Sequence, residues 1–299
     1  MSDEAAAYEF VSVVENLNRR YPDWRDPSRG SQHVFNRAQS YFGKSTKKHP
    51  GVGSTCRQLG CLERPIQNSH TIAESALKRI SVQSHVISPD IRDIKSPKTM
   101  SVGQGTASTF NGYCLEHEKL FSRTFETSGF NSDFHYTLQL MRSTAREIWK
   151  LESYLGYVEI NVKAYEESVL ELNLPPIIKR KLAKSVSFPL RSMKANAQRQ
   201  LQQMEHMLTW LTPAAEEGQS LPRNVKILKR KSGCNVALSG STNFHKAKLG
   251  SGTGLRNIPP FTLVFTVLPD SSGSLLMFAT SGDHIDLSLY IDQYFGAPE

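Results

Sequence analysis

Three of the four cysteines in this 299-residue chain lie between residues 56 and 114, and they constrain the fold more than any other feature. Four residues separate Cys56 from Cys61, and two residues separate Cys114 from His117. Zinc takes four tetrahedral ligands, commonly supplied as two close pairs that the fold brings together. The alternative is that these residues are unrelated buried thiols and a surface histidine. We predict that Cys56, Cys61, Cys114 and His117 hold a structural Zn²⁺ ion, and that the isolated Cys234 is a small buried hydrophobe.

The composition is typical of a globular protein of a reducing compartment. Hydrophobic residues make up 38% of the chain, which excludes a wholly disordered protein. No apolar run reaches the roughly eighteen residues of a membrane-spanning helix. The N-terminus gives no indication of a secretory signal, since it is acidic and begins MSDEAAAYEF. We therefore expect a cytoplasmic protein without a membrane partner, whose thiols stay reduced and free to bind metal.

Hydrophobic periodicity predicts helices over most of the chain and strands near its C-terminus. Apolar residues at helical spacing predict helices at about residues 5–20, 32–42, 71–80, from 114 onward, 132–172, 177–211 (ended by Pro213) and 284–294. β-Rich runs predict strands at 225–228, 234–238, 261–268 and 275–279, with a hairpin turn at 269–273. The polar stretch 81–108 is predicted to be irregular.

These elements predict an α+β fold, with a mostly helical body, an embedded zinc motif and a C-terminal antiparallel β-sheet domain. Changes in composition divide the chain into four predicted segments. They are an N-terminal helical segment (1–50), a zinc domain (51–130), a helical region (131–215) and a C-terminal β-rich domain (220–299).

Basic residues are concentrated in two stretches without acidic residues, one between Glu171 and Glu205 and the other between Glu217 and Asp270. The formal net charge is +8. This distribution is typical of proteins that bind polyanions, although a solvated surface without a partner has the same composition. We predict a nucleic-acid partner, DNA in preference to RNA. The candidate contacts are Lys179, Arg180, Lys181, Lys184, Lys229, Arg230 and Lys231.

The ligand pairs belong to a longer pattern. His70 precedes a predicted short helix, and Asn111 begins an Asn-x2-Cys-x2-His run that enters a second helix. Together with the Cys56/Cys61 pair, this pattern resembles the treble-clef zinc motif of the HNH (ββα-metal) endonuclease superfamily. The resemblance covers about residues 50–126, roughly a quarter of the chain, and it implies that the embedded zinc motif is a treble clef.

The resemblance also implies an activity, the hydrolysis of nucleic acid assisted by a catalytic Mg²⁺ or Mn²⁺ ion. His70 matches the general base that activates a water, and Asn111 matches the residue that holds this region in shape. Glu118 lies where a helical histidine of the superfamily binds the catalytic metal. Because HNH-like domains are frequent in prokaryotic anti-phage systems, the resemblance implies a role in defence, with a protein partner in a multi-component system.

Two departures from the family pattern leave other functions open. Ser69 stands where an acid or a second metal-binding histidine is usual, and Glu118 replaces a histidine. The alternative is therefore a catalytically inactive treble clef that binds nucleic acid or protein within a defence system. A third hypothesis is an interaction protein whose C-terminal sheet binds a partner.

His70 has alternative roles as well. Thr71 and Glu74 have the spacing of a capping box, which would place His70 just outside a helix N-terminus. There it would make a structural hydrogen bond or replace His117 as the fourth zinc ligand. Arg142 and Arg146, four residues apart on the predicted 132–172 helix, are interpreted as surface or packing charges, with contact to phosphate as the alternative if that helix flanks the site.

Overall fold

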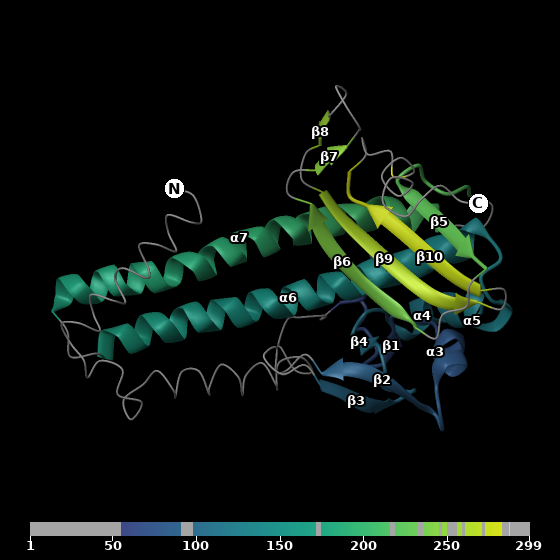
Figure 1. The fold of residues 1–299 in the computed structure, drawn as a ribbon, viewed down its shortest axis with the longest axis horizontal. Helices are drawn as coiled ribbons and strands as arrows, with labels where there is room; N and C mark the ends of the chain where they lie inside the picture. Colours follow the sequence, from purple (N-terminus) through teal and green to yellow (C-terminus); the bar gives the residue numbers. More distant parts are fainter. Residues whose placement is uncertain are drawn as a thin grey trace. The chain divides into compact units, whose positions relative to one another are not determined.

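The computed structural model describes residues 55–90, 98–171, 175–215, 219–231, 236–244, 247–249, 256–258, 261–270, 273–282 and 287 (Figure 1). The described chain contains helices and antiparallel sheets, which confirms the predicted α+β class. The helices predicted at 5–20 and 32–42 lie outside the described residues, as does nearly all of the one predicted at 284–294. No helix in the described ranges is both long and apolar enough to cross a membrane.

The chain divides into two compact units, each continuous in space but not in sequence. One comprises residues 1–52 and 151–199, and the other comprises residues 53–150 and 200–299. Contacts join the zinc-ligand segment to the C-terminal strands within the second unit, and the four predicted segments stay a prediction.

The zinc-ligand segment is built from short elements. In chain order they are β1 (Ser69–His70), α3 (Glu74–Ile80), β2 (His85–Asp90), β3 (Lys98–Gly103), β4 (Thr109–Phe110), α4 (Leu115–Ser122) and α5 (Phe125–Ser128). β1 pairs with β4 in antiparallel register, so that His70 lies opposite Thr109. Figure 1 shows this small pair of strands beside α4.

Two local predictions in this segment are wrong. Residues 81–108 are not irregular, because β2 and β3 form an antiparallel pair from His85↔Gly103 to Asp90↔Lys98. Of the two apolar residues at the start of β2, Val86 is buried and Ile87 is 72% exposed, so the strand does not form the continuous apolar run that would mark it in the sequence. The predicted capping box is also absent. α3 begins at Glu74, and the Thr71 hydroxyl donates instead to the Ser108 carbonyl at 3.0 Å.

Two long helices follow, α6 (Asp133–Glu171) and α7 (Pro176–Ala214), and they confirm the helices predicted at 132–172 and 177–211. Pro176 occupies the first position of α7, where its missing N–H is not needed. α7 does not end before Pro213 but includes it in its last turn. In the unit that contains residues 151–199, Lys194 of α7 forms an ion pair with Glu159 of α6 at 2.6 Å.

The C-terminal strands form the predicted antiparallel sheet, in the order β5-β10-β9-β6. Its strands are β5 (Val225–Arg230), β6 (Leu238–Phe244), β9 (Phe261–Asp270) and β10 (Gly273–Thr280), and a separate pair joins β7 (Ala247–Leu249) to β8 (Arg256–Ile258). β9 and β10 form the predicted hairpin. Of the strand predicted at 234–238, residues 234 and 235 lie outside the described residues, and with them the predicted burial of Cys234. The observed strand β6 begins at Leu238, and its Gly240 leaves room for the Phe265 ring of β9.

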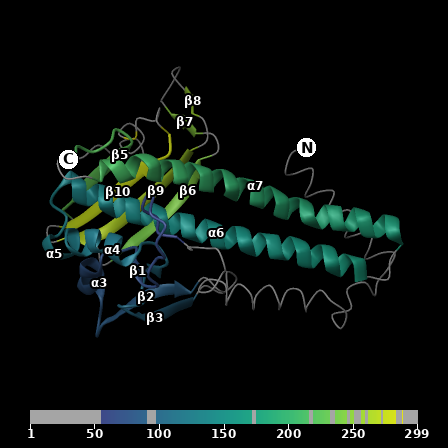
Figure 2. The same cartoon turned by 180° about the vertical axis from the view of Figure 1, so that it is seen from behind.

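The sheet has a core and a polar contact with the helices. A buried apolar cluster of β5, β9, β10 and the following chain comprises Leu228, Phe261, Leu263, Phe278 and Leu287. Side chains of α6 and α7 meet β9 through hydrogen bonds, Ser143 to Thr266 at 2.7 Å and Thr262 to Gln203 at 2.6 Å. Figure 2, seen from behind, shows the parts of α6 and α7 that belong to this unit in front of the sheet.

Candidate metal centre

The four predicted zinc ligands converge on one point. The Sγ atoms of Cys56, Cys61 and Cys114 and a ring nitrogen of His117 all lie within 4.8 Å of one another. His117 Nδ1 is 3.1 Å from Cys114 Sγ and 3.4 Å from Cys56 Sγ, and the Sγ atoms of Cys61 and Cys114 are 4.0 Å apart. All three cysteines are free thiols. Across the described ranges this is the one group of three or more His, Cys, Asp or Glu side chains that converges in this way.

These distances fit a single tetrahedral ion. A Zn²⁺ ion with Zn–S bonds of about 2.3 Å and a Zn–N bond of about 2.0 Å separates its ligand atoms by about 3.5–3.8 Å. The observed separations bracket that range. A Cys3His donor set is also a common structural zinc set. The arrangement is therefore compatible with a zinc site formed by the predicted residues, and it includes His117 rather than His70.

Backbone hydrogen bonds bring the two ligand pairs together. A tight turn closes the first pair, because the Cys61 N–H donates to the Gln58 carbonyl at 3.1 Å and the Gln58 N–H points at Cys56 Sγ at 3.5 Å. The Cys114 N–H donates to Cys56 Sγ at 3.3 Å, across the two pairs. Such N–H groups stabilise a thiolate, which is the form of cysteine that binds zinc.

The second ligand pair depends on the start of α4. Cys114 is the N-cap residue and His117 lies in the first turn, so both side chains are on the same end of the helix. Burial acts to raise the pKa of the Cys114 thiol, but hydrogen bonds from the backbone at His117 and Glu116 and from Cys56 outweigh it, and the pKa is lowered. Burial raises the pKa of Cys56 to about 12, so this thiol needs a cation to ionise.

The strand that carries His70 is hydrogen-bonded to the segment that carries the zinc ligands. The preceding Ser69 is fully buried, and its hydroxyl oxygen accepts the Tyr113 N–H at 3.2 Å, directly before Cys114. Within the described residues, the half-buried His70 ring makes one hydrogen bond, from Nδ1 to the Ala107 carbonyl at 3.0 Å. A carbonyl oxygen only accepts, so Nδ1 carries the proton and Nε2 of the neutral ring keeps a lone pair.

The other two predicted catalytic residues, Asn111 and Glu118, have different surroundings from those of His70. Asn111 is half-buried and directly follows β4, whose Thr109 pairs with His70. Glu118 lies on α4 and accepts a hydrogen bond from Arg142 through Oε1. Its second oxygen, Oε2, is buried and has no partner within the described part of the chain.

Arg142 is the residue of this region that sequence reasoning underestimated. Its side chain is 1% exposed, which makes it a packing charge rather than a surface charge. It donates to Glu118 and, at 2.6 Å, to Glu126, and its guanidinium lies 4.6 Å from the centre of the Phe121 ring. The sequence carries no local signal for this cluster, because Arg142 is 24 residues from Glu118.

The predicted nucleic-acid contacts fall in both units. Lys179, Arg180, Lys181 and Lys184 lie on α7 in the unit that contains residues 151–199, whereas Lys229 and Arg230 lie on β5 and Lys231 follows it in the other unit. Lys229 Nζ lies 5.6 Å from the centre of the Tyr136 ring, and hydrogen bonding to Tyr136 raises the pKa of this lysine. Their role as nucleic-acid contacts stays a prediction.

Comparison with known proteins adds no family to this picture. No family model, curated protein or solved structure matches the chain.

Proposed function

We propose that the protein is a zinc-stabilised, HNH-like nuclease whose Cys3His centre holds a treble-clef motif and whose His70 activates the attacking water. The observation that supports this most directly is the state of His70. Its Nδ1 is bound to the Ala107 carbonyl, while β1 is anchored to the ligand segment through Ser69 and Tyr113. The ring is thus held in one tautomer, with Nε2 available as a base.

The proposed chemistry is the hydrolysis of a phosphodiester. His70 Nε2 takes a proton from water as the water oxygen bonds to phosphorus. The bond from phosphorus to the leaving sugar oxygen breaks, its electron pair stays on that oxygen, and the oxygen takes a proton from a second water molecule. The four zinc ligands take no part in this step. Zn²⁺, once bound, supplies cross-linking of the Cys56–Cys61 turn to α4, so that the strand carrying His70 is positioned.

A catalytic Mg²⁺ or Mn²⁺ has less support from the residues present. Glu118 Oε1 is engaged by Arg142, and Oε2 is buried. Mg²⁺ commonly binds through one or two carboxylates together with substrate phosphates and water. A buried oxygen does not offer the open coordination that such an ion needs, so the proposed reaction does not use a metal ion bound to Glu118.

The same observations favour a second candidate, a catalytically inactive treble clef that binds nucleic acid or protein. Both positions at which the superfamily has metal-binding side chains have structural contacts here: Ser69 accepts the Tyr113 N–H, and Glu118 pairs with Arg142. The setting proposed for either candidate is the cytoplasm, where thiols stay reduced, and a role in anti-phage defence rests on the resemblance alone.

The deciding experiment is a cleavage assay with plasmid DNA and structured RNA, with and without Mg²⁺ or Mn²⁺. We expect the wild type to cut DNA and His70→Ala to lose cutting while it keeps its zinc content and unfolding temperature. His85→Ala is the matched control, because His85 also binds a backbone carbonyl through Nδ1, that of Gln83 at 2.8 Å, but is exposed on β2.

Each result separates the candidates. If His70→Ala cuts as well as the wild type, His70 is not the base. If the wild type binds DNA with a steep salt dependence but never cuts it, the inactive binding module is correct. If it neither cuts nor binds nucleic acid, the nuclease is wrong, and the inactive module can have only a protein partner.

A further inference from the structure

Two cations of α6 share one carboxylate oxygen. Arg146 Nη1 donates to Glu147 Oε1 at 3.3 Å, and Lys150 Nζ donates to the same oxygen at 2.6 Å. The two nitrogens are therefore no farther apart than the sum of these distances. Within the described residues, Glu147 is the one acidic partner of both cations.

The carboxylate that joins the two cations is fixed by the sheet and by α7. The Glu147 side chain is 8% exposed, and its second oxygen, Oε2, accepts the hydroxyl of Ser241 in β6 at 2.9 Å. Ser241 Oγ in turn accepts a hydrogen bond from Gln200 of α7 at 3.4 Å. The Arg146 and Lys150 side chains are 23% and 40% exposed, so both reach solvent. A buried, doubly bonded carboxylate thus holds two accessible cations in position.

The single carboxylate does not balance the charge of the two cations. Burial lowers the pKa of Lys150, the charge of Arg146 lowers it further, and Glu147 offsets only part of this effect. Burial also lowers the pKa of Arg146, although Glu147 acts in the opposite direction. A second anion bound here would supply the negative charge that Glu147 alone does not.

This turn of α6 packs against the strands of the zinc-ligand segment. Trp149, between the two cations in sequence, places the edge of its ring against Phe110 of β4, with the ring centres 6.4 Å apart. Phe110 pairs with Ser69 of β1, which directly precedes His70. The two cations therefore belong to the helix that contacts the strand pair of the proposed base.

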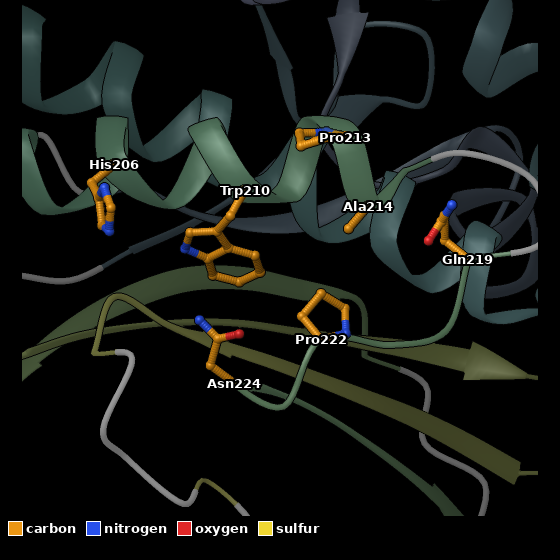
Figure 3. Close-up of a pocket in the computed structure, with 7 residues that line it drawn as sticks. All are labelled: His206, Trp210, Pro213, Ala214, Gln219, Pro222 and Asn224. Atoms are coloured by element: carbon orange, nitrogen blue, oxygen red, sulfur yellow. The ribbon is translucent and has the colours of Figure 1, made fainter.

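A pocket beside the C-terminal end of α7, in the same unit, offers no comparable pair of cations among its described lining residues. Figure 3 shows Trp210, Pro222 and Asn224 on its walls, and the described part of the chain contributes no lysine or arginine to them. Charge therefore favours the turn of α6 as the place where a phosphate group binds.

We propose that Arg146 and Lys150 together bind one phosphate group of a nucleic-acid backbone. A guanidinium presents a planar fork of N–H donors that matches phosphate oxygens, and an ammonium adds a compact charge with three donors. Because both nitrogens bond the same carboxylate oxygen, they are close enough for one phosphate to contact both. The proposal rests on the proposed nucleic-acid substrate, but it does not require His70 to act as a base.

A phosphate can come from two sources, a nucleic-acid backbone or free phosphate, and two titrations distinguish them. Both use the full-length, zinc-loaded protein without added Mg²⁺ or Mn²⁺. A short labelled DNA duplex is titrated by fluorescence anisotropy over a series of salt concentrations, and inorganic phosphate is titrated by calorimetry. Binding of the duplex that depends on Arg146 and Lys150 supports the proposal. Binding of inorganic phosphate alone contradicts the assignment to nucleic acid.

Variants test whether the two cations carry the binding. Arg146→Gln leaves Lys150 and Glu147 as a one-to-one pair, so the fold should be kept. It should weaken duplex binding about 10-fold or more, the conversion of at least about 1.5 kcal/mol for a hydrogen bond to a charged group. Arg146→Gln and Lys150→Gln should each make the slope of log affinity against log salt concentration shallower by about 0.9. Arg146→Lys keeps the charge and should keep the slope.

Lys194→Gln is the matched control. Lys194 is 32% exposed and bonds Glu159 at 2.6 Å, as Lys150 bonds Glu147, but in a one-to-one pair. It should bind the duplex with the wild-type slope. All variants are first compared with the wild type by unfolding temperature and zinc content, so that a change in binding is not a loss of folding.

The outcomes separate this proposal from the nuclease. If no duplex binds, or if folded Arg146→Gln and Lys150→Gln bind it as Lys194→Gln does, the phosphate site is wrong. Duplex binding that depends on Arg146 in a protein that never cuts nucleic acid supports the site and contradicts the nuclease. Cleavage that depends on His70, with binding that neither variant changes, does the reverse.

Discussion

Replacing Arg142 is the sharpest test of what holds the ligand-bearing helix in place. Arg142 of α6 is almost fully buried and joins α6 to Glu118 of α4 and to Glu126 of α5. Arg142→Met keeps an unbranched apolar side chain of similar length but removes the charge. The variant therefore leaves two carboxylates without their cation, and we expect a loss of stability rather than a new packing defect.

The size of the loss follows from the exposure of the partners. Removing one member of a buried ion pair costs about 3–5 kcal/mol, because the remaining charge stays buried. The Glu118 and Glu126 side chains are 16% and 17% exposed, so water reaches them partly and the lower end of that range applies. Because Arg142 and Phe121 are both buried, the loss of their cation–π contact adds about 2 kcal/mol. We expect the free energy of unfolding to fall by about 5 kcal/mol.

The assay is urea unfolding of the wild type, Arg142→Met, Glu118→Gln and the double variant, in buffer saturated with zinc. We expect a coupling energy of about 1–3 kcal/mol between Glu118 and Arg142. Lys119→Met is the control on the same helix, because its partner Glu116 is 74% exposed and an exposed ion pair contributes little to stability. A coupling energy near zero, or equal losses for Arg142→Met and Lys119→Met, refutes this account of the cluster.

Three further predictions concern the metal, its neighbouring strand and the sheet. Cys114→Ser should lose zinc by elemental analysis and become protease-sensitive, because a structural zinc contributes about 10 kcal/mol or more to a small metal domain; full zinc content in the variant would contradict the proposed site. Ser69→Ala leaves a buried backbone N–H of the ligand segment without its acceptor and should cost about 1–3 kcal/mol in urea unfolding. Gly273→Ala should lower the free energy of unfolding by more than about 1 kcal/mol, since φ is +146° and a Cβ would lie 1.8 Å from a carbonyl oxygen of β5. The control is Gly105→Ala, where a Cβ meets nothing within 4 Å, and its stability should stay near that of the wild type.

Features that depend on local spacing could be predicted from the sequence. The zinc ligands were identifiable because two close pairs of cysteine and histidine in one segment are typical of a zinc site, and the pairs converge as expected. The helix over 132–172 followed from a continuous apolar stripe, and the β9–β10 hairpin followed from the turn residues at 269–273. In each case the residues that decide the structure are neighbours along the chain.

Features that depend on distant partners could not be predicted. Thr71 and Glu74 have the spacing of a capping box, but the Thr71 hydroxyl binds the carbonyl of Ser108, 37 residues away. The strand at 238–244 contains glycine, serine and asparagine, which favour turns, and its pairing with β9 outweighs that preference.

Glu118 is the residue that best distinguishes the two candidate functions. One oxygen of the Glu118 carboxylate accepts a hydrogen bond from Arg142, and the other oxygen is buried. The carboxylate therefore contributes to stability and has no accessible oxygen with which to bind a hydrated cation. If the double-variant cycle finds strong coupling between Glu118 and Arg142, any catalytic cation must bind mainly through substrate phosphates and water. Nuclease activity would then depend on His70 far more than on Glu118, and cleavage by Glu118→Gln at the wild-type rate would be its expected consequence.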